Sequence, residues 1–279
     1  MELTDETYES LRAHIQRLCG LNLLDDRRYL IRDRLGRLVQ QHGLTGFDGL
    51  ALRLGEGPSV KLENEVVESI LTGETSFFRD AHVFSVIAKS ILPAILAQQP
   101  PGDQPLRILS AGVSTGQEAY SLAMLAHEQG LRSTNGRGAS GYSVIGTDIS
   151  SRALAIAANG IYHRRDLDRG LDPIRQLNYF EPAGDRFKVK SSLREPVEFI
   201  QVNFKDPLNL RGPFDLICCR NVMIYFDNAL RQRLCDQFHR LLRPRGWLII
   251  GAAENLYGLS TGYQSVQFEG NVFCYQRKN

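Results

Sequence analysis

The sequence has almost no excess of charge of either sign and no paired cysteine motif. Its 33 basic and 31 acidic residues leave a formal net charge of +2. It therefore has no overall basic field with which to hold a nucleic-acid backbone, and we expect no nucleic-acid partner. The five cysteines include no C-x-x-C pair, which favours a reducing, cytoplasmic compartment and predicts no metal site.

Long apolar runs are absent too. No window approaches the ~20 apolar residues of a membrane-spanning helix, and residues 1–10 are acidic and polar, unlike a signal peptide. We therefore expect no membrane insertion. With 43% hydrophobic and 23% charged residues, the 279-residue chain has the composition of an ordinary globular protein.

Residues 1–80 contain helical patterns only. A helix over residues 25–42 carries an apolar stripe, and Pro58 fits the first turn of a later helix. We predict a helical domain over residues 1–80. Residues 81–105 follow as a connecting helix, kinked at Pro93, and a linker.

From residue 106 onward strands alternate with helices, which predicts a mostly parallel sheet with helices on both faces over residues 106–279. The expected strands are 106–110, 142–148, 197–203, 214–220 and 247–251, and the expected helices are 117–129 and 229–242. Residues 131–141 form a polar loop. Residues 160–196 interrupt the alternation with a small antiparallel hairpin.

A glycine-rich turn follows the first expected strand. Gly112 and Gly116 lie between strand and helix, where backbone must approach a ligand closely. The spacing is not G-x-G-x-x-G and no Gly-Lys-Ser/Thr follows, which weakens dinucleotide and triphosphate interpretations. A tight strand-to-helix turn without a ligand explains the glycines nearly as well.

Asp148 ends the second expected strand, where an acidic side chain can accept hydrogen bonds from both hydroxyls of a ribose. Alone it is equally well explained as a solvated loop residue. Together with the glycine turn it favours a ligand that contains a nucleoside.

Five separated motifs resemble those of the chemotaxis receptor glutamate methyltransferases (the CheR family), over nearly the whole chain. They are ETSFFR at 74–79, SAGVSTGQE at 110–118, GTDI at 146–149, CRNVMIYFD at 219–227 and LRPRGWLIIG at 242–251. The resemblance implies a monomer with an all-helical N-terminal domain. A Rossmann-like S-adenosylmethionine-dependent methyltransferase domain follows, with a β-subdomain inserted at about 160–196.

The resemblance also implies the reaction. Members of this family transfer a methyl group from S-adenosylmethionine to glutamate side chains of chemoreceptor cytoplasmic domains, and release S-adenosylhomocysteine. The implied cofactor-binding residues are Thr75, Arg79, Gly112, Gln117, Glu118, Asp148, Asn203, Phe204, Arg220 and Asn221. Tyr225 is implied at the reacting centre together with Arg79.

Two positions depart from the family pattern. The family usually has an acidic pair and a proline after Ser-Thr-Gly, whereas this chain has Gln117-Glu118-Ala119. Which of Gln117 and Glu118 contacts the cofactor ammonium group stays open. The family also usually has asparagine where this chain has Gly73.

The implied chemistry is consistent with the residues available. A glutamate carboxylate, with an ordinary pKa of about 4.3, is already ionised at neutral pH, so a methyl transfer to it needs no general base. The site must supply approach geometry and exclude water. Arg79 can orient the incoming carboxylate through paired N–H donors, and Tyr225 can present its ring to the sulfonium or its hydroxyl to the carboxylate.

Two other functions are alternatives to this one. The altered Gln117–Ala119 stretch favours a non-catalytic module that binds S-adenosylmethionine as a scaffold or sensor. A small-molecule methyltransferase fits the sheet domain but leaves the helical domain unexplained.

The helix over residues 25–42 also carries candidate docking arginines. At 100° per residue, Arg28 and Arg32 lie on one flank of the apolar stripe, and Arg34 and Arg37 lie on the other. Rim arginines with solvated heads are one interpretation. The other, which the resemblance favours, is that one flank docks the acidic receptor helix.

Overall fold

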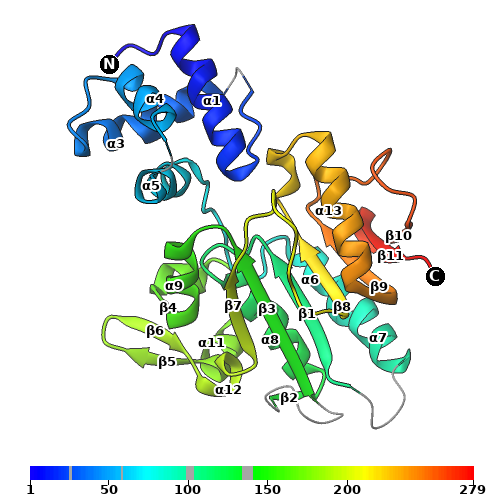
Figure 1. Cartoon of the computed structure of the whole chain (residues 1–279). Coiled ribbons are helices and arrows are strands. Elements are labelled where there is room, and N and C mark those ends of the chain that lie inside the picture. Colours follow the sequence, from blue (N-terminus) through cyan, green and yellow to red (C-terminus); the bar gives the residue numbers. More distant parts are fainter. Residues whose placement is uncertain (25–26, 58, 99–103, 134–140) are drawn as a thin grey trace.

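The computed structural model describes residues 1–24, 27–57, 59–98, 104–133 and 141–279. Pro58, most of the 99–105 linker and the centre of the 131–141 loop lie outside the described residues. Within them, an all-helical N-terminal region precedes a mixed α/β sheet domain, which confirms the predicted fold class. Figure 1 shows the helical region lying together at one end of the molecule.

The N-terminal helices pack around a core of their own, into which Leu11, Ile15, Leu35 and Val66 are buried. They are α1 (Asp5–Cys19), α2 (Arg28–Leu30), the π-helical turn η2 (Ile31–Leu35), α3 (Gly36–Gln41), α4 (Phe47–Gly55) and α5 (Val60–Ile70). The helix predicted over 25–42 is thus a helical run over 28–41 with a π turn in its middle, and α4 was not predicted. A π turn has more residues per turn than an α-helix, so a spacing of 100° per residue does not hold across it.

The predicted connecting helix is continuous over Ala81–Gln98, as α6 (Ala81–Val86), the π turn η3 (Ile87–Ile91) and α7 (Leu92–Gln98). The π turn ends two residues before Pro93, whose missing N–H and ring disturb the normal hydrogen-bond ladder of the helix. This 18-residue helix has a mean hydropathy of 1.4, enough by length and composition alone to cross a membrane. The expectation that no segment approaches that length was wrong here, although Val83, Ile87 and Ile91 are buried in the core as in any internal helix.

The main sheet has the order β10-β11-β9-β8-β1-β3, with β7 and the short β2 both pairing with β3. Its strands are β1 (Leu106–Ala111), β2 (Arg132–Ser133), β3 (Gly141–Asp148), β7 (Val197–Gln201), β8 (Phe214–Cys219), β9 (Leu242–Ile250), β10 (Tyr263–Phe268) and β11 (Val272–Arg277). Within this sheet, β1, β3, β7, β8 and β9 pair in parallel. Strand β11 runs antiparallel to both of its neighbours, β9 and β10. The five predicted strands are confirmed, although β9 begins at Leu242 and not at residue 247. Strands β10 and β11 were not predicted, and neither was β2, which lies in the predicted 131–141 loop.

Helices cover both faces of this sheet. Because neighbouring side chains along a strand point to opposite sides, a single strand contributes to the core on each face. On β1, Ile108 belongs to the core that contains α6, α7 and α8 (Gln117–Glu128). Leu109 belongs to the core of the other face, under α13 (Asn228–Leu241). Helix α9 (Ser151–Asn159) follows β3 and packs against β7.

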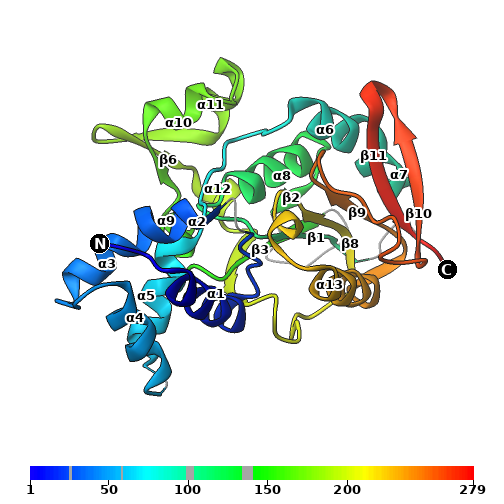
Figure 2. The same ribbon diagram turned by 90° about the horizontal axis from the view of Figure 1, so that it is seen from above.

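A second, three-stranded antiparallel sheet, in the order β4-β6-β5, is inserted between β3 and β7. It contains β4 (Ile161–Tyr162), β5 (Phe180–Ala183) and β6 (Arg186–Val189), with α10 (Arg164–Asp168), α11 (Pro173–Tyr179) and α12 (Ser191–Arg194). The predicted hairpin is confirmed as β5–β6, and β4 was not predicted. Figure 2 shows this subdomain on the other side of the molecule from β10 and β11.

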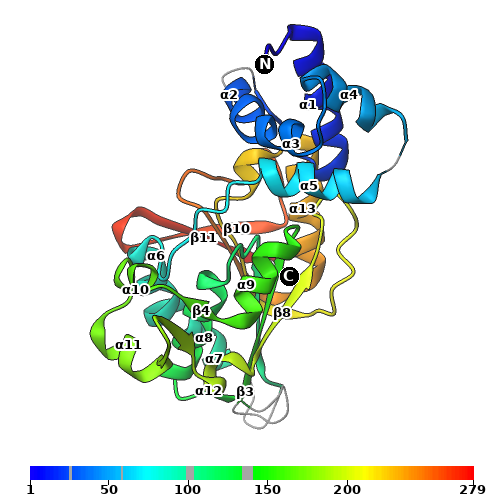
Figure 3. The same ribbon diagram turned by 90° about the vertical axis from the view of Figure 1, so that its left-hand side faces the viewer.

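The helical region lies over the carboxyl ends of the parallel strands. Glu68 on α5 accepts hydrogen bonds from the hydroxyls of Ser150 (2.5 Å) and Ser151 (3.4 Å), at the start of α9. Asn203, beyond β7, donates from its Nδ2 to the Leu18 carbonyl of α1 at 2.8 Å. Figure 3 shows α5 as the part of the helical region nearest α9.

Candidate functional site

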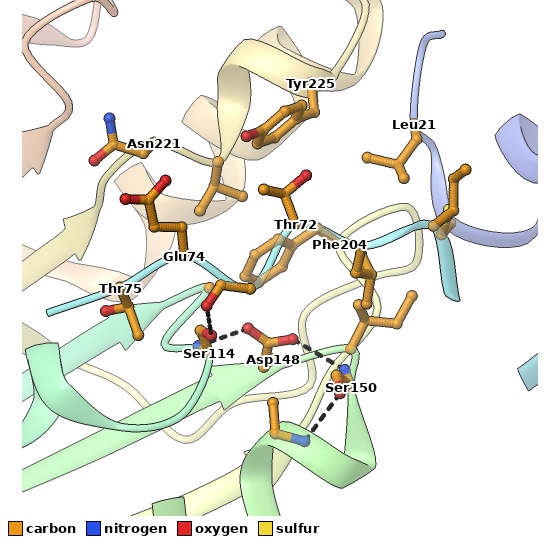
Figure 4. A pocket seen from close by; sticks show the side chains of 18 of the residues that line it. Leu21, Thr72, Glu74, Thr75, Ser114, Asp148, Ser150, Phe204, Asn221 and Tyr225 are labelled. Carbon is orange, nitrogen blue, oxygen red and sulfur yellow. Dashed lines mark hydrogen bonds between the residues drawn. The ribbon is translucent and has the colours of Figure 1, made fainter. Parts of the chain in front are cut away.

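A cavity of about 350 Å³ lies between the helical region and the carboxyl edge of the sheet, the place where open α/β sheets bind ligands. Ten residues predicted from the sequence line it: Thr75, Arg79, Gly112, Glu118, Asp148, Asn203, Phe204, Arg220, Asn221 and Tyr225. Figure 4 shows Tyr225 across the cavity from Asp148 and Ser114. Motifs up to 150 residues apart in the sequence thus meet at one place.

The glycine turn after β1 brings backbone up to this cavity. Gly112 has a φ of +80°, and a Cβ there would lie 2.3 Å from Cγ2 of Val222. Only glycine therefore fits at Gly112, which allows the β1 and β8 loops to touch. Two residues later, the Ser114 N–H points to Oδ2 of Asp148 at 2.8 Å.

Each oxygen of the Asp148 carboxylate accepts one backbone hydrogen bond. Oδ2 accepts from Ser114 N–H and Oδ1 from Ser150 N–H, at 2.8 and 2.9 Å. Burial raises the pKa of Asp148 above its ordinary value, although these two hydrogen bonds oppose the rise. Each oxygen keeps further acceptor capacity, so the carboxylate can also accept from two ligand hydroxyls.

A buried ion-pair network contributes Glu118 and Arg220 to the cavity wall. Arg220 donates from Nη1 to Oε2 of Glu118 at 3.0 Å and from Nη2 to Oδ2 of Asp80 at 2.6 Å. Its side chain is 2% exposed, against 13% for Glu118. Burial alone would lower the pKa of Arg220, but the carboxylates of Glu118 and Asp80 contribute to a net rise, so the arginine stays charged.

The structure distinguishes the two candidates for the ammonium contact by position. Gln117 is buried and is not among the residues that line the cavity; its Oε1 accepts from the Thr115 hydroxyl at 2.8 Å. Glu118 lines the cavity and is held by Arg220 and by the Ser110 hydroxyl. Of these two residues, only Glu118 therefore lines the cavity.

The segment between the two regions crosses the mouth of the cavity. Arg79 donates from Nη1 to the Glu74 carbonyl at 2.9 Å, which folds the segment back on itself around Thr75. The Glu74 carboxylate accepts from Arg169 at 2.7 Å, and this hydrogen bond is the largest of the causes that lower the pKa of Glu74.

Tyr225 lies in a short turn after β8, η4 (Met223–Tyr225). Its carbonyl accepts from the Asn22 N–H at 2.8 Å, and the guanidinium of Arg27 lies over its ring, 5.3 Å from the centroid. Asn221, at the start of the same loop, has a left-handed φ of +58°. The helical region therefore holds Tyr225 from the side away from the sheet.

None of the four candidate docking arginines lines the cavity. Arg28 contacts Asp5 and the Leu3 carbonyl, and Arg34 donates to the carbonyls of Ile70 and Leu71 at the end of α5. Arg32 and Arg37 are exposed and make no hydrogen bond or ion pair within the described part of the chain. Two of the four thus hold the helical region together, and two are free for a partner.

The cavity residues that were missed from the sequence include Arg27, Glu68 and Ser114. Arg27 and Glu68 lie on surface positions of helical segments and belong to no motif, so no sequence pattern distinguishes them. Ser114 lies inside the predicted glycine turn, and its left-handed φ of +51° is what aims its N–H at Asp148.

The lining fits S-adenosylmethionine by its chemistry. Asp148 offers acceptors for ribose hydroxyls, Phe204 an apolar ring surface, and Glu118 an anion for the ammonium group. Burial raises the pKa of the lining thiol, Cys19, to about 11, and no histidine of the described residues lines the cavity. Among the described residues, the cavity therefore pairs no histidine with a serine or cysteine, the arrangement that activates a side-chain nucleophile.

The same assignment follows from comparison with known proteins. Residues 73–272 match the family described as CheR methyltransferase, SAM binding domain, and residues 6–68 match the CheR methyltransferase, all-alpha domain. The chain is 35% identical to chemotaxis protein methyltransferase Cher2 of Pseudomonas putida, over 97% of this chain and 98% of that protein. It is 34% identical to the chemotaxis protein methyltransferase of Escherichia coli, over 91% of this chain and 86% of that protein.

Proposed function

The chain belongs to the CheR methyltransferase family, a family of S-adenosylmethionine-dependent methyltransferases, and we propose that its substrate is the glutamate side chain of chemoreceptor cytoplasmic domains. The products are a glutamate methyl ester and S-adenosylhomocysteine. The observation that supports this most is that Asp148, Arg79 and Tyr225 line one cavity at the carboxyl edge of the sheet. A second candidate, a non-catalytic S-adenosylmethionine-binding scaffold, is favoured only by the altered Gln117–Ala119 stretch.

S-adenosylmethionine supplies an activated methyl group on a positively charged sulfur. Asp148 would hold the ribose, Asn203 and Phe204 would flank the adenine, and Glu118 would hold the ammonium group. Thr75, Gly112, Arg220 and Asn221 close the remaining walls. Asn203 is hydrogen-bonded to Leu18, and Tyr225 to Asn22, both of which lie in the helical region. This region therefore forms part of the same pocket.

The chain orients the substrate instead of activating it. The glutamate carboxylate is ionised at neutral pH, so no side chain has to act as a general base before it accepts the methyl group that S-adenosylmethionine would supply, with S-adenosylhomocysteine as the leaving group. Arg79 orients that carboxylate through charged N–H donors. Tyr225 and the segment 72–76 exclude water and hold the approach in line.

One assay tests the proposed function. The protein is incubated with methyl-labelled S-adenosylmethionine and receptor cytoplasmic fragments, and base-labile methyl esters are measured. Label on receptor glutamates supports the enzyme. Tight cofactor binding without label on any receptor fragment supports the scaffold and rejects the proposal.

Two substitutions at Tyr225 separate the role of its ring from the role of its hydroxyl. If its ring face acts on the sulfonium, Tyr225→Phe keeps most of the activity and Tyr225→Ala loses it. If its hydroxyl positions the carboxylate, both variants lose activity. The measurement is kcat with receptor fragments, and full activity in the alanine variant removes Tyr225 from the site.

Docking of the receptor on the helical run over residues 28–41 is tested at Arg32 and Arg37, the two candidate arginines that make no hydrogen bond or ion pair within the described residues. Reversing Arg32 and Arg37 to glutamate should raise KM for the receptor at low salt and leave cofactor affinity unaltered. A Debye length of about 8–10 Å near physiological salt means that the wild-type KM should also rise steeply with ionic strength. Arg28→Glu and Arg34→Glu are less informative, because both side chains bind carbonyls within the helical region.

The matched control reverses two other exposed arginines, Arg211 and Arg240, with the same change in net charge. Its KM should stay close to the wild-type value. If the Arg32 and Arg37 reversal also leaves KM unchanged at low salt, docking takes place elsewhere.

The structure of the β-subdomain favours an enzyme that does not need to bind a peptide at the receptor C-terminus. Some members of the family grip a peptide at the receptor C-terminus by adding a strand to this sheet. Here β5 is an edge strand that carries Pro182, which has no N–H, and the β5–β6 turn is short. We expect no tight binding of a receptor C-terminal pentapeptide by calorimetry; tight binding that hairpin substitutions abolish would overturn this.

A further inference from the structure

A buried carboxylate outside the cavity joins the two loops that follow β8 and β9. Glu254 is 8% exposed. Its Oε2 accepts from the N–H groups of Asn221 (3.0 Å) and Gly251 (2.6 Å), and its Oε1 from the N–H of Ile224 (3.0 Å). Glu254 is not among the residues that line the cavity.

The surrounding backbone is shaped around this carboxylate. A Cβ on Gly251 would lie 2.7 Å from Oε2 of Glu254 and 2.9 Å from the Asn221 nitrogen. The Glu254 N–H also donates to the Gly251 carbonyl at 2.9 Å, which closes a tight turn. The glycine therefore allows both loops to reach one acceptor.

Two of the three N–H donors belong to the loop that carries the predicted site residues. Asn221 is held in a left-handed conformation, φ +58°, and Ile224 directly precedes Tyr225 in η4. From these contacts we propose that Glu254 is a positioning residue that sets Asn221 and Tyr225 in the cavity. The proposal rests on the proposed function, because it assumes the roles of those two residues.

A carboxylate suits this position for a chemical reason. All three partners are N–H donors, so the group between them must be an acceptor at both ends, as an ionised carboxylate is and an amide is not. A glutamine of the same shape would direct its own NH₂ at a backbone N–H. Its loop would have to shift, or leave a buried donor without a partner.

The first test is amide hydrogen exchange, measured by NMR on the full chain with no cofactor or receptor. In Glu254→Gln the N–H groups of Asn221, Ile224 and Gly251 should exchange at least about tenfold faster than in the wild type, the equivalent of one charged hydrogen bond. The control is Glu269→Gln, the same chemical change at an exposed position, which should leave them unchanged. If Glu254→Gln does not fold, Glu254→Asp replaces it, with faster exchange expected at the same three amides.

The second test is a double-mutant cycle on methyl transfer with Tyr225→Ala. Glu254→Gln should lower kcat by about tenfold or more at saturating receptor and weaken S-adenosylhomocysteine binding through Asn221. In the Tyr225→Ala background the same change should lower the residual kcat, measured with labelled cofactor at high enzyme concentration, by much less. A lower melting temperature with unchanged kcat and cofactor affinity would indicate a merely structural role and overturn the proposal.

The two proposals fail in different ways. Unchanged exchange at the three amides overturns the positioning role, whatever the receptor assay gives. A wild-type protein that binds S-adenosylhomocysteine but labels no receptor overturns the proposed function. The exchange and affinity results for Glu254→Gln still decide the positioning role in that case.

Discussion

Replacing Asp148 by alanine should weaken S-adenosylhomocysteine binding by about tenfold or more. A hydrogen bond to a charged acceptor contributes roughly 1.5–3 kcal/mol, and we propose that the carboxylate accepts two such bonds from the ribose. The measurement is calorimetric titration of folded protein. An unchanged dissociation constant rejects the ribose assignment.

The alanine variant also removes the acceptor of the Ser114 and Ser150 N–H groups. Asp148→Asn is therefore the matched variant, because its amide oxygen keeps one of these bonds and the shape of the side chain. Its NH₂ group faces the other N–H, so if it binds the product as weakly as the alanine variant, product binding needs an acceptor at both oxygens, for the backbone N–H groups as well as for the ribose hydroxyls.

The same carboxylate predicts a pH dependence. Only the ionised form offers acceptors on both oxygens, and burial raises the pKa of Asp148. Product affinity should therefore fall as the pH is lowered through this raised pKa, starting at a higher pH than an unperturbed aspartate would give. In Asp148→Asn this part of the pH dependence should be absent.

The elements that the sequence predicted are those with a strong periodic pattern. The buried strands β1, β3 and β8 are short, mostly apolar segments between turn signals, so their positions follow from the local sequence pattern. Strand β10 was missed because it is an edge strand with polar residues at Gln264, Ser265 and Gln267, and it pairs only with β11. Its stability comes from tertiary pairing, which a single segment does not encode.

The site divides in the same way. Asp148, Glu118 and Tyr225 lie in motifs at strand ends, and the parallel sheet brings those ends together. Arg27 and Glu68 reach the cavity only because the helical region sits on that edge of the sheet. This placement depends on contacts between regions distant in the sequence, such as Asn203 with Leu18, and no local pattern predicts it.

Replacing Arg220 by methionine should lower the free energy of unfolding by about 3–5 kcal/mol, because it leaves buried carboxylate charge without its partner. Arg220 is the common donor to Glu118, Asp80 and the Arg79 carbonyl. Methionine keeps apolar volume beside Phe84, over whose ring the guanidinium lies. The loss measured by chemical denaturation should therefore come mainly from the charges.

Two comparisons test that reason. Arg53→Met removes an exposed ion pair with Glu56, in which both side chains are more than half exposed, and should cost no more than about 1 kcal/mol. Combining Arg220→Met with Glu118→Gln removes the more buried of the two carboxylate charges left unpaired and should recover part of the stability, since a buried pair contributes less as a whole than one broken partner costs. If Arg220→Met costs as little as Arg53→Met, the network does not join the segment between the two regions to the sheet. If the double variant is less stable than Arg220→Met alone, the loss arises from packing and not from the buried charge of Glu118.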